Sequence, residues 1–577
     1  MIKKLPSNLI NQIAAGEVVD DPASIVKELL ENSIDANSDS IEIILFDGGK
    51  KKIIVNDNGI GINKNEIKTA FKRFATSKIK NAEDLNKINT LGFRGEALPS
   101  IASISEVVIK SKTKKELGHE YKISYGKEIH SKPSSIECGT SIEIKNIFNN
   151  LPARKKFLKS ENYEYRKILS LFKVFSLHYS KINMRLINNE KIVYDFKGTN
   201  LINRISALYT KNISDSLIEI NFKKDNYKIS GYIGNLSLVK QSRGNQFLYI
   251  NGRYIKDKLI NMSIYSAYRS LIARGEYPFF ILFLDLPSNY LDVNVHPKKQ
   301  EVKFENELQI QHIFKLSISE ALKNITRTIP SYNPIQFTED IETSEIPFSS
   351  KEIASEHILT ASNSASYAEN IKNAEIRLNR TDEDRIEIES NNVWQIHNKY
   401  IITEITSGII IIDQHVAHER ILYEASKKSI EEGEGVSSQK VLFPQVVKFN
   451  PENYTYLLEI MYYLKKIGFE FREFGDNQII IEGSPNNLPI GKEEETINEI
   501  IEHYIKTKNT KSEFIEYMAS TYACKAAIKA GDKLSAEECK ELIDELFSTE
   551  HPYYCPHGRP IIINLPIEDL DKRFERH

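Results

Sequence analysis

Residues 408–424, GIIIIDQHVAHERILYE, combine an apolar run with several residues that bind metals or carry protons. Asp413 follows four isoleucines and is therefore expected at the end of a strand. If a helix begins there, His415 and Glu419 lie one turn apart on the same face, where an imidazole and a carboxylate can hold one divalent ion. A strand-end aspartate alone is more typical of a helix cap.

Two later fragments also contain metal-ligating residue types. YACKAAIKAGDKL places Cys524 on an expected helix, and YYCPHGRP places Cys555 and His557 two residues apart, so that they face one way if the loop is extended. A lone cysteine usually packs rather than ligates, and Cys539 fits that description. The three fragments together favour a metal site near the end of the printed sequence.

A second group of motifs occurs near the beginning of the sequence. In KELLENSIDA, Glu28 and Asn32 are four residues apart and share one helix face. A carboxylate at such a position can orient or deprotonate a water molecule, and an amide oxygen can bind Mg²⁺. In DNGIG, Asp57 can accept a hydrogen bond from an adenine amino group, while Gly59 and Gly61 let the backbone approach a nucleotide.

Two more stretches are suited to phosphate binding. RFATSK contains Thr76, Ser77 and Lys78, and GFRGEAL (92–98) is a glycine-rich turn leading into a helix whose N–H groups can hold phosphates. Each motif alone is weak, because DNGxG is often a hairpin turn and an ExxxN helix is often a solvated face. The sequence contains no GxxxxGK[ST] phosphate-binding loop.

Alternating helix and strand patterns around these motifs predict an α/β (α+β) fold. Asp20-Asp21-Pro22 is typical of a helix start, and residues 25–30 then form an apolar stripe. SIEIILFDGGKKKIIVND predicts two strands joined at Gly48-Gly49. TSIEIKNIF, QFLYINGRYI and FFILFLDL predict further strands.

The overall charge of −2 hides an asymmetry between two halves. Residues 1–330 contain 51 Lys and Arg against 35 Asp and Glu, and the remainder contains 26 against 44. The basic half suggests a polyanion partner such as DNA, although a basic solvated surface has the same composition. No apolar run reaches membrane-spanning length, and 4 cysteines make no disulfide framework, so a cytoplasmic protein is expected.

The order and spacing of the motifs resemble the GHKL ATPase superfamily. NQIAAGEVVDDPASIVKELLENSIDA, FATSKI, LGFRGEALPSIASIS, LPARKKFL and DVNVHPKKQEVKF are similar to the DNA mismatch repair MutL family within it, over essentially all of residues 1–330. The resemblance implies that Glu28 is the general base for ATP hydrolysis, Asn32 binds Mg²⁺ and Asp57 recognises adenine.

It also implies a set of residues around the phosphates and the adenine. Thr76, Ser77 and Lys78 belong to a lid, Thr140 supports the adenine site, and Lys299 reaches the γ-phosphate from a second subdomain. The residues expected to wrap the phosphates are Gly92, Phe93, Arg94, Gly95, Glu96, Ala97 and Leu98. Charge alone suggests DNA contacts from Arg253, Lys256, Lys258, Arg269 and Arg274.

DQHVAHERILYE, ACK and CPHGRP are similar to the endonuclease motifs of nicking members of the family. The implied metal ligands are Asp413, His415, Glu419, Cys524, Cys555 and His557, with Mn²⁺ as the catalytic ion and Zn²⁺ as a structural or regulatory one. Val416 and Lys525 replace the usual Ala and Arg, and Val416 adds bulk. His418 is a further possible ligand without an assigned place.

The resemblance implies four parts in the chain. They are a GHKL ATPase domain (1–205), a ribosomal-S5-like subdomain that contacts DNA (206–330), a flexible acidic linker (331–389), and a dimerisation and endonuclease domain (390–577).

The implied activity is an ATP-dependent DNA clamp and matchmaker that couples MutS to strand incision and nicks DNA as a homodimer. Gln439, Leu442 and Phe443 resemble a sliding-clamp-binding peptide, or an ordinary apolar strand ending at Pro444. Alternatives are a non-nicking matchmaker with a structural zinc site, or another GHKL protein.

Overall fold

The computed structural model describes most of the chain in two compact units. The described residues are 19–79, 90–92, 94–209, 213–240, 244–269, 271–272, 275–287, 290–292, 302–328, 393–432, 436–507 and 511–576. One unit comprises 1–325, 438–484 and 493–510, and the other comprises 326–437, 485–492 and 511–577. The linker expected at 331–389 lies outside the described residues, and the domain boundaries stay predictions.

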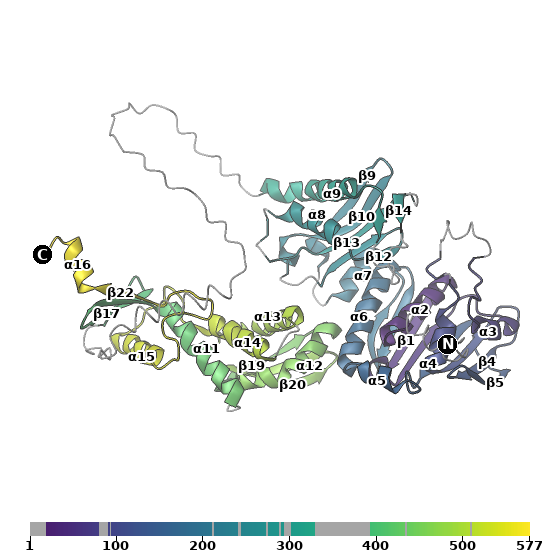
Figure 1. The fold of residues 1–577 in the computed structure, drawn as a ribbon, viewed down its shortest axis with the longest axis horizontal. Coiled ribbons are helices and arrows are strands. Elements are labelled where there is room, and N and C mark those ends of the chain that lie inside the picture. Colours follow the sequence, from purple (N-terminus) through teal and green to yellow (C-terminus); the bar gives the residue numbers. More distant parts are fainter. Residues whose placement is uncertain are drawn as a thin grey trace, which may run out of the picture. The chain divides into compact units, whose positions relative to one another are not determined.

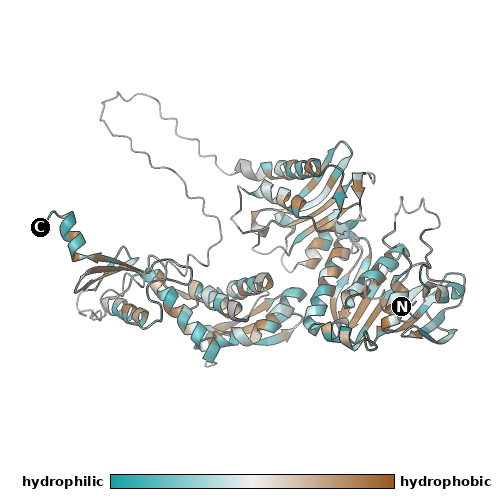
Figure 2. Ribbon diagram, viewed as in Figure 1, coloured by the Kyte–Doolittle hydropathy of each residue, from teal (hydrophilic) through white to brown (hydrophobic). Residues whose placement is uncertain are grey.

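An eight-stranded sheet forms the framework of the N-terminal region, in the order β5-β4-β3-β6-β2-β1-β7-β8. Only the β1–β7 pair is parallel among the pairs of this sheet that the structure describes. Hydrophobic residues recur along its strands (Figure 2). The strands are β1 (Ser40–Phe46), β2 (Lys52–Asp57), β3 (Glu106–Lys112), β4 (His119–Ser124), β5 (Lys127–Pro133), β6 (Gly139–Lys145), β7 (Asn183–Asn188) and β8 (Lys191–Phe196).

Helix α2 (Pro22–Asp35) begins where the sequence predicted. The Asp21 carboxylate accepts the Ser24 N–H at 2.8 Å, and Pro22 occupies the first turn, where its missing N–H costs nothing. Ile25, Leu29 and their apolar neighbours are buried against the sheet, which confirms the predicted stripe. The opposite side of the helix is therefore left for polar residues such as Glu28 and Asn32.

Further helices accompany this sheet (Figure 1). α4 contacts β3 and β4, and α6 contacts α2. The helices of residues 64–208 are α3 (Lys64–Ala70), α4 (Ala97–Ile104), α5 (Pro152–Phe157), α6 (Glu161–His178) and α7 (Leu201–Leu208).

A five-stranded sheet in the order β12-β11-β13-β10-β9 follows in the chain. Its strands and helices share a second hydrophobic core that includes Ile229, Ile264, Leu282 and Phe314. β11, β12 and β13 confirm the strands predicted from QFLYINGRYI and FFILFLDL. The elements are β9 (Leu217–Lys224), β10 (Tyr227–Gly234), β11 (Gln246–Ile250), β12 (Arg253–Ile255), α8 (Lys258–Tyr268), β13 (Phe280–Asp285), β14 (Leu291–Asp292), β15 (Lys303–Phe304) and α9 (Glu307–Thr328).

The other unit is built on an antiparallel sheet in the order β16-β17-β18-β22. Ile401, Ile410 and Ile412 from this sheet pack with residues of α11 and α15 in one core. The elements are β16 (Val393–Ile396), β17 (Tyr400–Ile405), β18 (Gly408–Asp413), α11 (Gln414–Glu432), α14 (Lys511–Ala526), α15 (Ala536–Phe547), β22 (Ile562–Pro566) and α16 (Ile567–Arg573).

A three-stranded sheet in the order β19-β21-β20 is formed by residues 438–485. Its elements and the accompanying helices are β19 (Ser438–Lys448), α12 (Pro451–Lys466), β20 (Glu470–Gly475), β21 (Gln478–Pro485) and α13 (Glu493–Thr507). Among the helices that the structure describes, none has both the length and the apolarity of a bilayer-crossing segment.

Candidate ATPase and metal sites

A cavity of about 1610 Å³ opens beside α2 and brings most of the N-terminal motifs together. The predicted nucleotide-site residues that line it are Glu28, Asn32, Asp57, Gly61, Thr76, Ser77, Lys78, Gly92, Arg94, Gly95, Glu96, Ala97, Leu98 and Thr140. Phe93 and Lys299 lie outside the described residues. Segments that are distant in the sequence therefore meet around one space large enough for a nucleotide.

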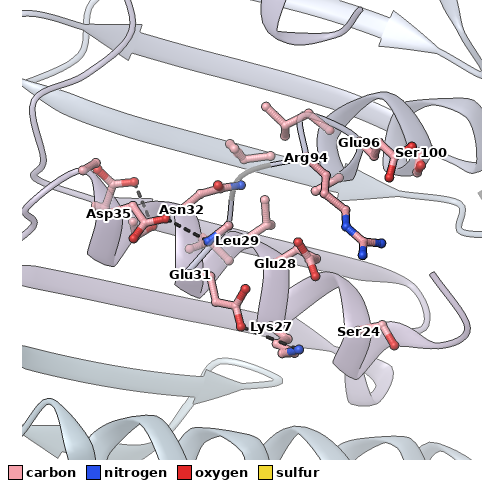
Figure 3. Close-up of a pocket in the computed structure, with 18 of the residues that line it drawn as sticks. Ser24, Lys27, Glu28, Leu29, Glu31, Asn32, Asp35, Arg94, Glu96 and Ser100 are labelled. Carbon is pink, nitrogen blue, oxygen red and sulfur yellow. Dashed lines mark hydrogen bonds and ion pairs between the residues drawn. The ribbon is translucent and has the colours of Figure 1, made fainter. Parts of the chain in front are cut away.

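Glu28 and Asn32 extend into this cavity from the same face of α2 (Figure 3). Their spacing of four residues places them about one helical turn apart, as the sequence predicted. Arg94, at the glycine-rich turn, reaches toward the same space as Glu28 (Figure 3). The cavity thus has a carboxylate that can act on water, an amide oxygen and a nearby guanidinium.

Asp57 lies at the end of β2, on the wall of the cavity. Its carboxylate accepts hydrogen bonds from the Ser33 hydroxyl at 2.9 Å and from the Gly59 N–H at 2.9 Å. Burial is the largest influence on this carboxyl and raises its pKa above the usual value, although these hydrogen bonds oppose the shift. Thr140 is directly opposite Asp57 in the β2–β6 register and is buried beside it.

Two glycines that line the cavity are required by backbone packing. Gly61 has φ +75°, and a Cβ there would lie 2.2 Å from the Lys112 carbonyl oxygen. Gly95 has φ +64°, and a Cβ there would lie 2.5 Å from the Ala75 carbonyl oxygen. Any side chain would push these loops apart, so the two glycines keep the wall of the cavity close and its N–H groups accessible.

Lys78 lies deeper in the site than the lid role alone predicted. Its ammonium group donates to the Asn32 side-chain oxygen at 2.9 Å and pairs with Asp35 at 2.5 Å. Asn32, the residue expected to bind Mg²⁺, therefore contacts the ammonium cation of Lys78 in this structure. A position that accepts a cation is consistent with the predicted metal. Asp35 was missed, although its position three residues after Asn32 places it on the same helix face.

The second candidate site lies between α11, α14 and the loop before β22. The ligand atoms of Glu419, Cys555 and His557 all lie within 4.8 Å of one another. The Cys524 thiol donates to Glu419 Oε1 at 2.6 Å, and His557 Nδ1 lies 3.0 Å from the same oxygen. Four of the six predicted ligands thus converge on one buried carboxylate, and two thiols, an imidazole and a carboxylate fit Zn²⁺.

The other two predicted ligands make different contacts. Asp413 Oδ1 accepts the N–H groups of His415 and Val416 at 3.0 and 3.1 Å, so this residue caps α11. His415 Nδ1 lies 2.7 Å from the Ile528 carbonyl oxygen, and only its donor form makes a hydrogen bond there. In the neutral form of the ring, this bond places the proton on Nδ1 and leaves Nε2 as the nitrogen that can bind a metal.

His418 and Gln414 hold the loop that follows α14. His418 Nδ1 accepts the Ile528 N–H at 2.9 Å, and burial lowers the pKa of His418 to about 4, which keeps the ring neutral. Gln414 is fully buried and donates to the carbonyl oxygens of Asn398, Lys529 and Asp532. The two side chains therefore fix the loop next to Cys524, a role that no local spacing in the sequence could indicate.

Glu424 fixes the approach to Cys555 and His557. Its carboxylate accepts the N–H groups of Glu550 and His551 at 2.7 and 3.2 Å and pairs with Arg420. Val416 is buried in the hydrophobic core of this unit, and that core also includes Cys555.

The remaining predicted contact residues are mostly exposed. Leu442 and Phe443 are 89% and 82% exposed on β19, which continues through Pro444 to Lys448. An apolar strand ending at Pro444 is therefore wrong in its extent. Lys256, Lys258 and Arg269 are exposed, Arg253 is half-buried, and Arg274 lies outside the described residues.

Comparison with known proteins identifies the class first. Residues 21–154 match the family of histidine kinase-, DNA gyrase B- and HSP90-like ATPases. The N-terminal sheet, α2 and the cavity are therefore those of a GHKL-type ATPase, as the sequence predicted. Residues 205–323 match the C-terminal domain family of DNA mismatch repair proteins, and residues 393–534 match the MutL C-terminal dimerisation domain.

Full-length relatives identify the family. The DNA mismatch repair proteins MutL of Chloroherpeton thalassium and Clostridium acetobutylicum are each 38% identical to this chain, with 100% of the chain and 100% and 99% of the relatives covered. The chain belongs to the MutL family of DNA mismatch repair proteins, and it contains an ATPase domain and a separate C-terminal dimerisation domain.

Solved structures also match the N-terminal part. The N-terminal domain of a DNA repair protein is 26% identical, with a TM-score of 0.49, covering 56% of this chain and 100% of that one. The Aquifex aeolicus MutL ATPase domain complexed with ADP is 23% identical, with a TM-score of 0.37, covering 52% and 98%.

Proposed function

We propose that this chain is an ATP-dependent DNA clamp and matchmaker that couples mismatch recognition by MutS to strand incision and makes the nick itself. The observation that carries the proposal is the convergence of Glu419, Cys524, Cys555 and His557 in the same chain as the ATP site. A carboxylate, two thiols and an imidazole at one place form a ligand set for the divalent ions that strand incision requires. ATP binding brings two N-terminal domains together around DNA.

Hydrolysis at the N-terminal site depends on groups held by α2. Glu28 orients the attacking water and accepts its proton, and Asp57 accepts the adenine amino group. Lys78, Arg94 and the N–H groups near Gly95 bind the phosphates. Asn32 would hold Mg²⁺, and the bound ion would supply charge neutralisation at the phosphates. Turnover is slow, because a clamp needs time on DNA more than rapid hydrolysis.

The second site carries the incision chemistry. Bound divalent ions, Mn²⁺ for cutting and Zn²⁺ for structure or regulation, supply an activated water and charge neutralisation for attack on a phosphodiester. Glu419, Cys524, Cys555 and His557 hold such ions, with His415 Nε2 available as a further ligand. Asp413 orients the first turn of α11 and, with it, His415.

The homodimer forms through the outer face of the β16-β17-β18-β22 sheet. The register aligns Trp394 with Ile402, Ile402 with Ile411, and Ile411 with Ile563 on this face. Trp394 and Ile563 are 50% and 56% exposed. When one face of an antiparallel sheet packs on the core, the other face normally carries polar residues that contact water. A row of exposed apolar residues on that other face therefore favours burial against a second copy of the chain.

Partner contacts are assigned by charge and exposure. The exposed Lys256, Lys258 and Arg269 neutralise DNA phosphates. Leu442 and Phe443 present apolar side chains from β19, as a peptide that binds the replication sliding clamp must. The clamp then orients the cut.

Plasmid nicking tests the proposal directly. Purified protein in Mn²⁺ is expected to nick supercoiled plasmid, and Glu419→Lys is expected to abolish the nick while leaving ATP hydrolysis unchanged. Asp413→Ala, which removes the acceptor that caps α11, is expected to weaken the nick, whereas Asp413→Asn retains that acceptor. Glu431→Lys is a matched control, because Glu431 lies exposed on the same helix away from the cluster.

The variants separate the proposal from its alternative. Nicking that survives in Glu419→Lys would reflect a contaminating nuclease and overturn the assignment. If the wild-type protein fails to nick with ATP and clamp present but still binds zinc, the chain is a non-nicking matchmaker with a structural zinc site.

A further inference from the structure

The Lys78 ammonium occupies the place at Asn32 where the proposed function puts Mg²⁺. Its distance to the Asn32 side-chain oxygen is 2.9 Å, within hydrogen-bond range. A Cβ placed on Gly92 would lie 3.2 Å from Lys78 Nζ and 3.9 Å from both the Asn32 oxygen and an Asp35 oxygen. Lys78, Asn32 and Asp35 therefore meet at one point below Gly92, and a metal ion at Asn32 cannot coexist with the ammonium.

Asp35 is the residue that keeps Lys78 there. Its Oδ2 atom lies 2.5 Å from Lys78 Nζ, and the Asp35 side chain is only 8% exposed. The same carboxylate accepts the N–H groups of Leu91 and Gly92 at 3.0 and 3.2 Å. Charge-assisted contacts to a poorly hydrated carboxylate are strong, so Lys78 leaves Asp35 only for a comparable anion. Nucleotide phosphates are such an anion.

We propose that Asp35 is a positioning residue that makes nucleotide binding and Mg²⁺ binding interdependent by holding Lys78 on Asn32 until phosphates draw it away. Without nucleotide, the ammonium excludes Mg²⁺ from Asn32. When a nucleotide enters, Lys78 moves from Asp35 to the phosphates, and the Asn32 oxygen becomes available to the metal. This inference rests on the proposed role of Asn32 as a Mg²⁺ ligand.

The exchange predicts an unusual result for removing the Asp35 charge. In Asp35→Asn, Lys78 is no longer retained, so ADP without Mg²⁺ binds at least threefold more tightly than in the wild type. The factor by which Mg²⁺ tightens ADP binding falls accordingly. Lys78→Met weakens ADP binding without Mg²⁺, and adding Asp35→Asn to Lys78→Met changes ADP affinity less than twofold, because Asp35 acts through Lys78.

Isothermal titration of ADP with and without Mg²⁺ measures all four proteins without relying on hydrolysis. Asp39→Asn is the matched control, since it makes the same substitution at an exposed aspartate that follows the helix and does not line the cavity, and its ADP affinity is expected to equal that of the wild type. Thermal melting shows whether each variant is folded. If Asp35→Asn melts below the assay temperature, the comparison of Lys78→Met with the wild type still tests retention of Lys78.

The outcomes separate two failures. Wild-type ADP affinity that does not depend on Mg²⁺ would remove the role of Asn32. The second failure requires a wild type whose ADP affinity does depend on Mg²⁺. If Asp35→Asn then weakens ADP binding equally with and without Mg²⁺, or weakens it in the Lys78→Met background as well, the role of Asn32 remains. Asp35 would in that case only support the loop at Leu91 and Gly92.

Discussion

The thiol of Cys524 lies 2.6 Å from Oε1 of Glu419, although 105 positions separate the two residues in the sequence. The first comes from α14 and the second from α11, which pack along each other. His557 approaches the same carboxylate oxygen at 3.0 Å. The Cys524 thiol and the His557 ring thus approach one carboxylate oxygen, and a metal ion that replaces the thiol proton would be held by all three groups.

Zinc content tests this arrangement. Cys524→Ser and His557→Ala are each expected to lower zinc affinity about tenfold or more, because even residues behind the ligands typically contribute 10–100-fold. Competition with a chromophoric chelator measures the affinity. Cys138→Ser, in the ATPase domain, serves as the control and should keep the wild-type value. Unchanged affinity in both test variants would exclude these residues as ligands.

His415 and His418 contact the backbone of Ile528 on the two sides of its Cα, His415 at the carbonyl oxygen and His418 at the N–H. His418→Asn retains an acceptor near the position of Nδ1, whereas His418→Gln places its acceptor about one bond further out. We therefore expect His418→Asn to stay within about twofold of the wild-type zinc affinity and His418→Gln to lose about tenfold. Equal losses in the two variants would contradict the hydrogen-bond role.

Adenine recognition by Asp57 is expected to depend on pH. Burial raises the pKa of this carboxyl, so the ionised acceptor is lost at a higher pH than for an ordinary aspartate, and ADP affinity falls as the pH drops through that value. Calorimetric titration of ADP between neutral and acidic pH measures the effect, with melting curves to show that the domain stays folded. A pH-independent ADP affinity in this range would be incompatible with the idea.

Asp57→Asn removes the charge itself. A hydrogen bond to a charged group contributes about 1.5–3 kcal/mol, so ADP affinity should fall roughly 10–100-fold. A raised pKa means that Asp57 contributes stability at low pH and loses that contribution as the pH rises, so the substitution should not lower Tm at neutral pH. A lower Tm together with weaker ADP binding would indicate a structural role instead.

If the homodimer forms through the outer face of the β16-β17-β18-β22 sheet, charged substitutions on that face should make the protein monomeric. Trp394→Glu combined with Ile563→Glu places charges on the exposed apolar row. Burying an uncompensated charge in an interface is costly, and each substitution is present in both copies of a two-fold symmetric dimer. Dimer affinity should therefore fall about 100-fold or more. Sedimentation equilibrium measures it. Phe474→Glu, equally exposed on β20, is the control, and a dimeric double variant would place the interface elsewhere.

Local chemistry explains which parts of the fold were predictable. The start of α2 was correct because Asp21 and Pro22 act within one turn, and the β1–β2 pair was correct because alternating burial follows directly from alternating residues. The spacing of Glu28 and Asn32 placed both on one face for the same reason. Such features need no knowledge of the rest of the chain.

Long-range contacts explain what was missed. His418 could not be placed because its partner, Ile528, is 110 positions away and contributes only a backbone N–H, which any residue can supply. Gln414 similarly contacts three carbonyl groups. Asp35 was within reach of helical spacing, but Lys78 and Leu91 approach it from a loop whose course the sequence did not reveal.

The pairing of β18 with β22 determines when the metal cluster can exist during synthesis. The Asp413 N–H donates to the Ile561 carbonyl oxygen at 3.0 Å, and Cys555 and His557 directly precede that strand. After Glu419, a ribosome must add residues 420–554, with Cys524 among them, before it reaches Cys555 and His557. The ATPase sheet is complete long before then. A chain that terminates after the ATPase sheet and before Cys555 therefore retains a nucleotide site but lacks part of the cluster around Glu419, so the incision centre that we propose does not form in it.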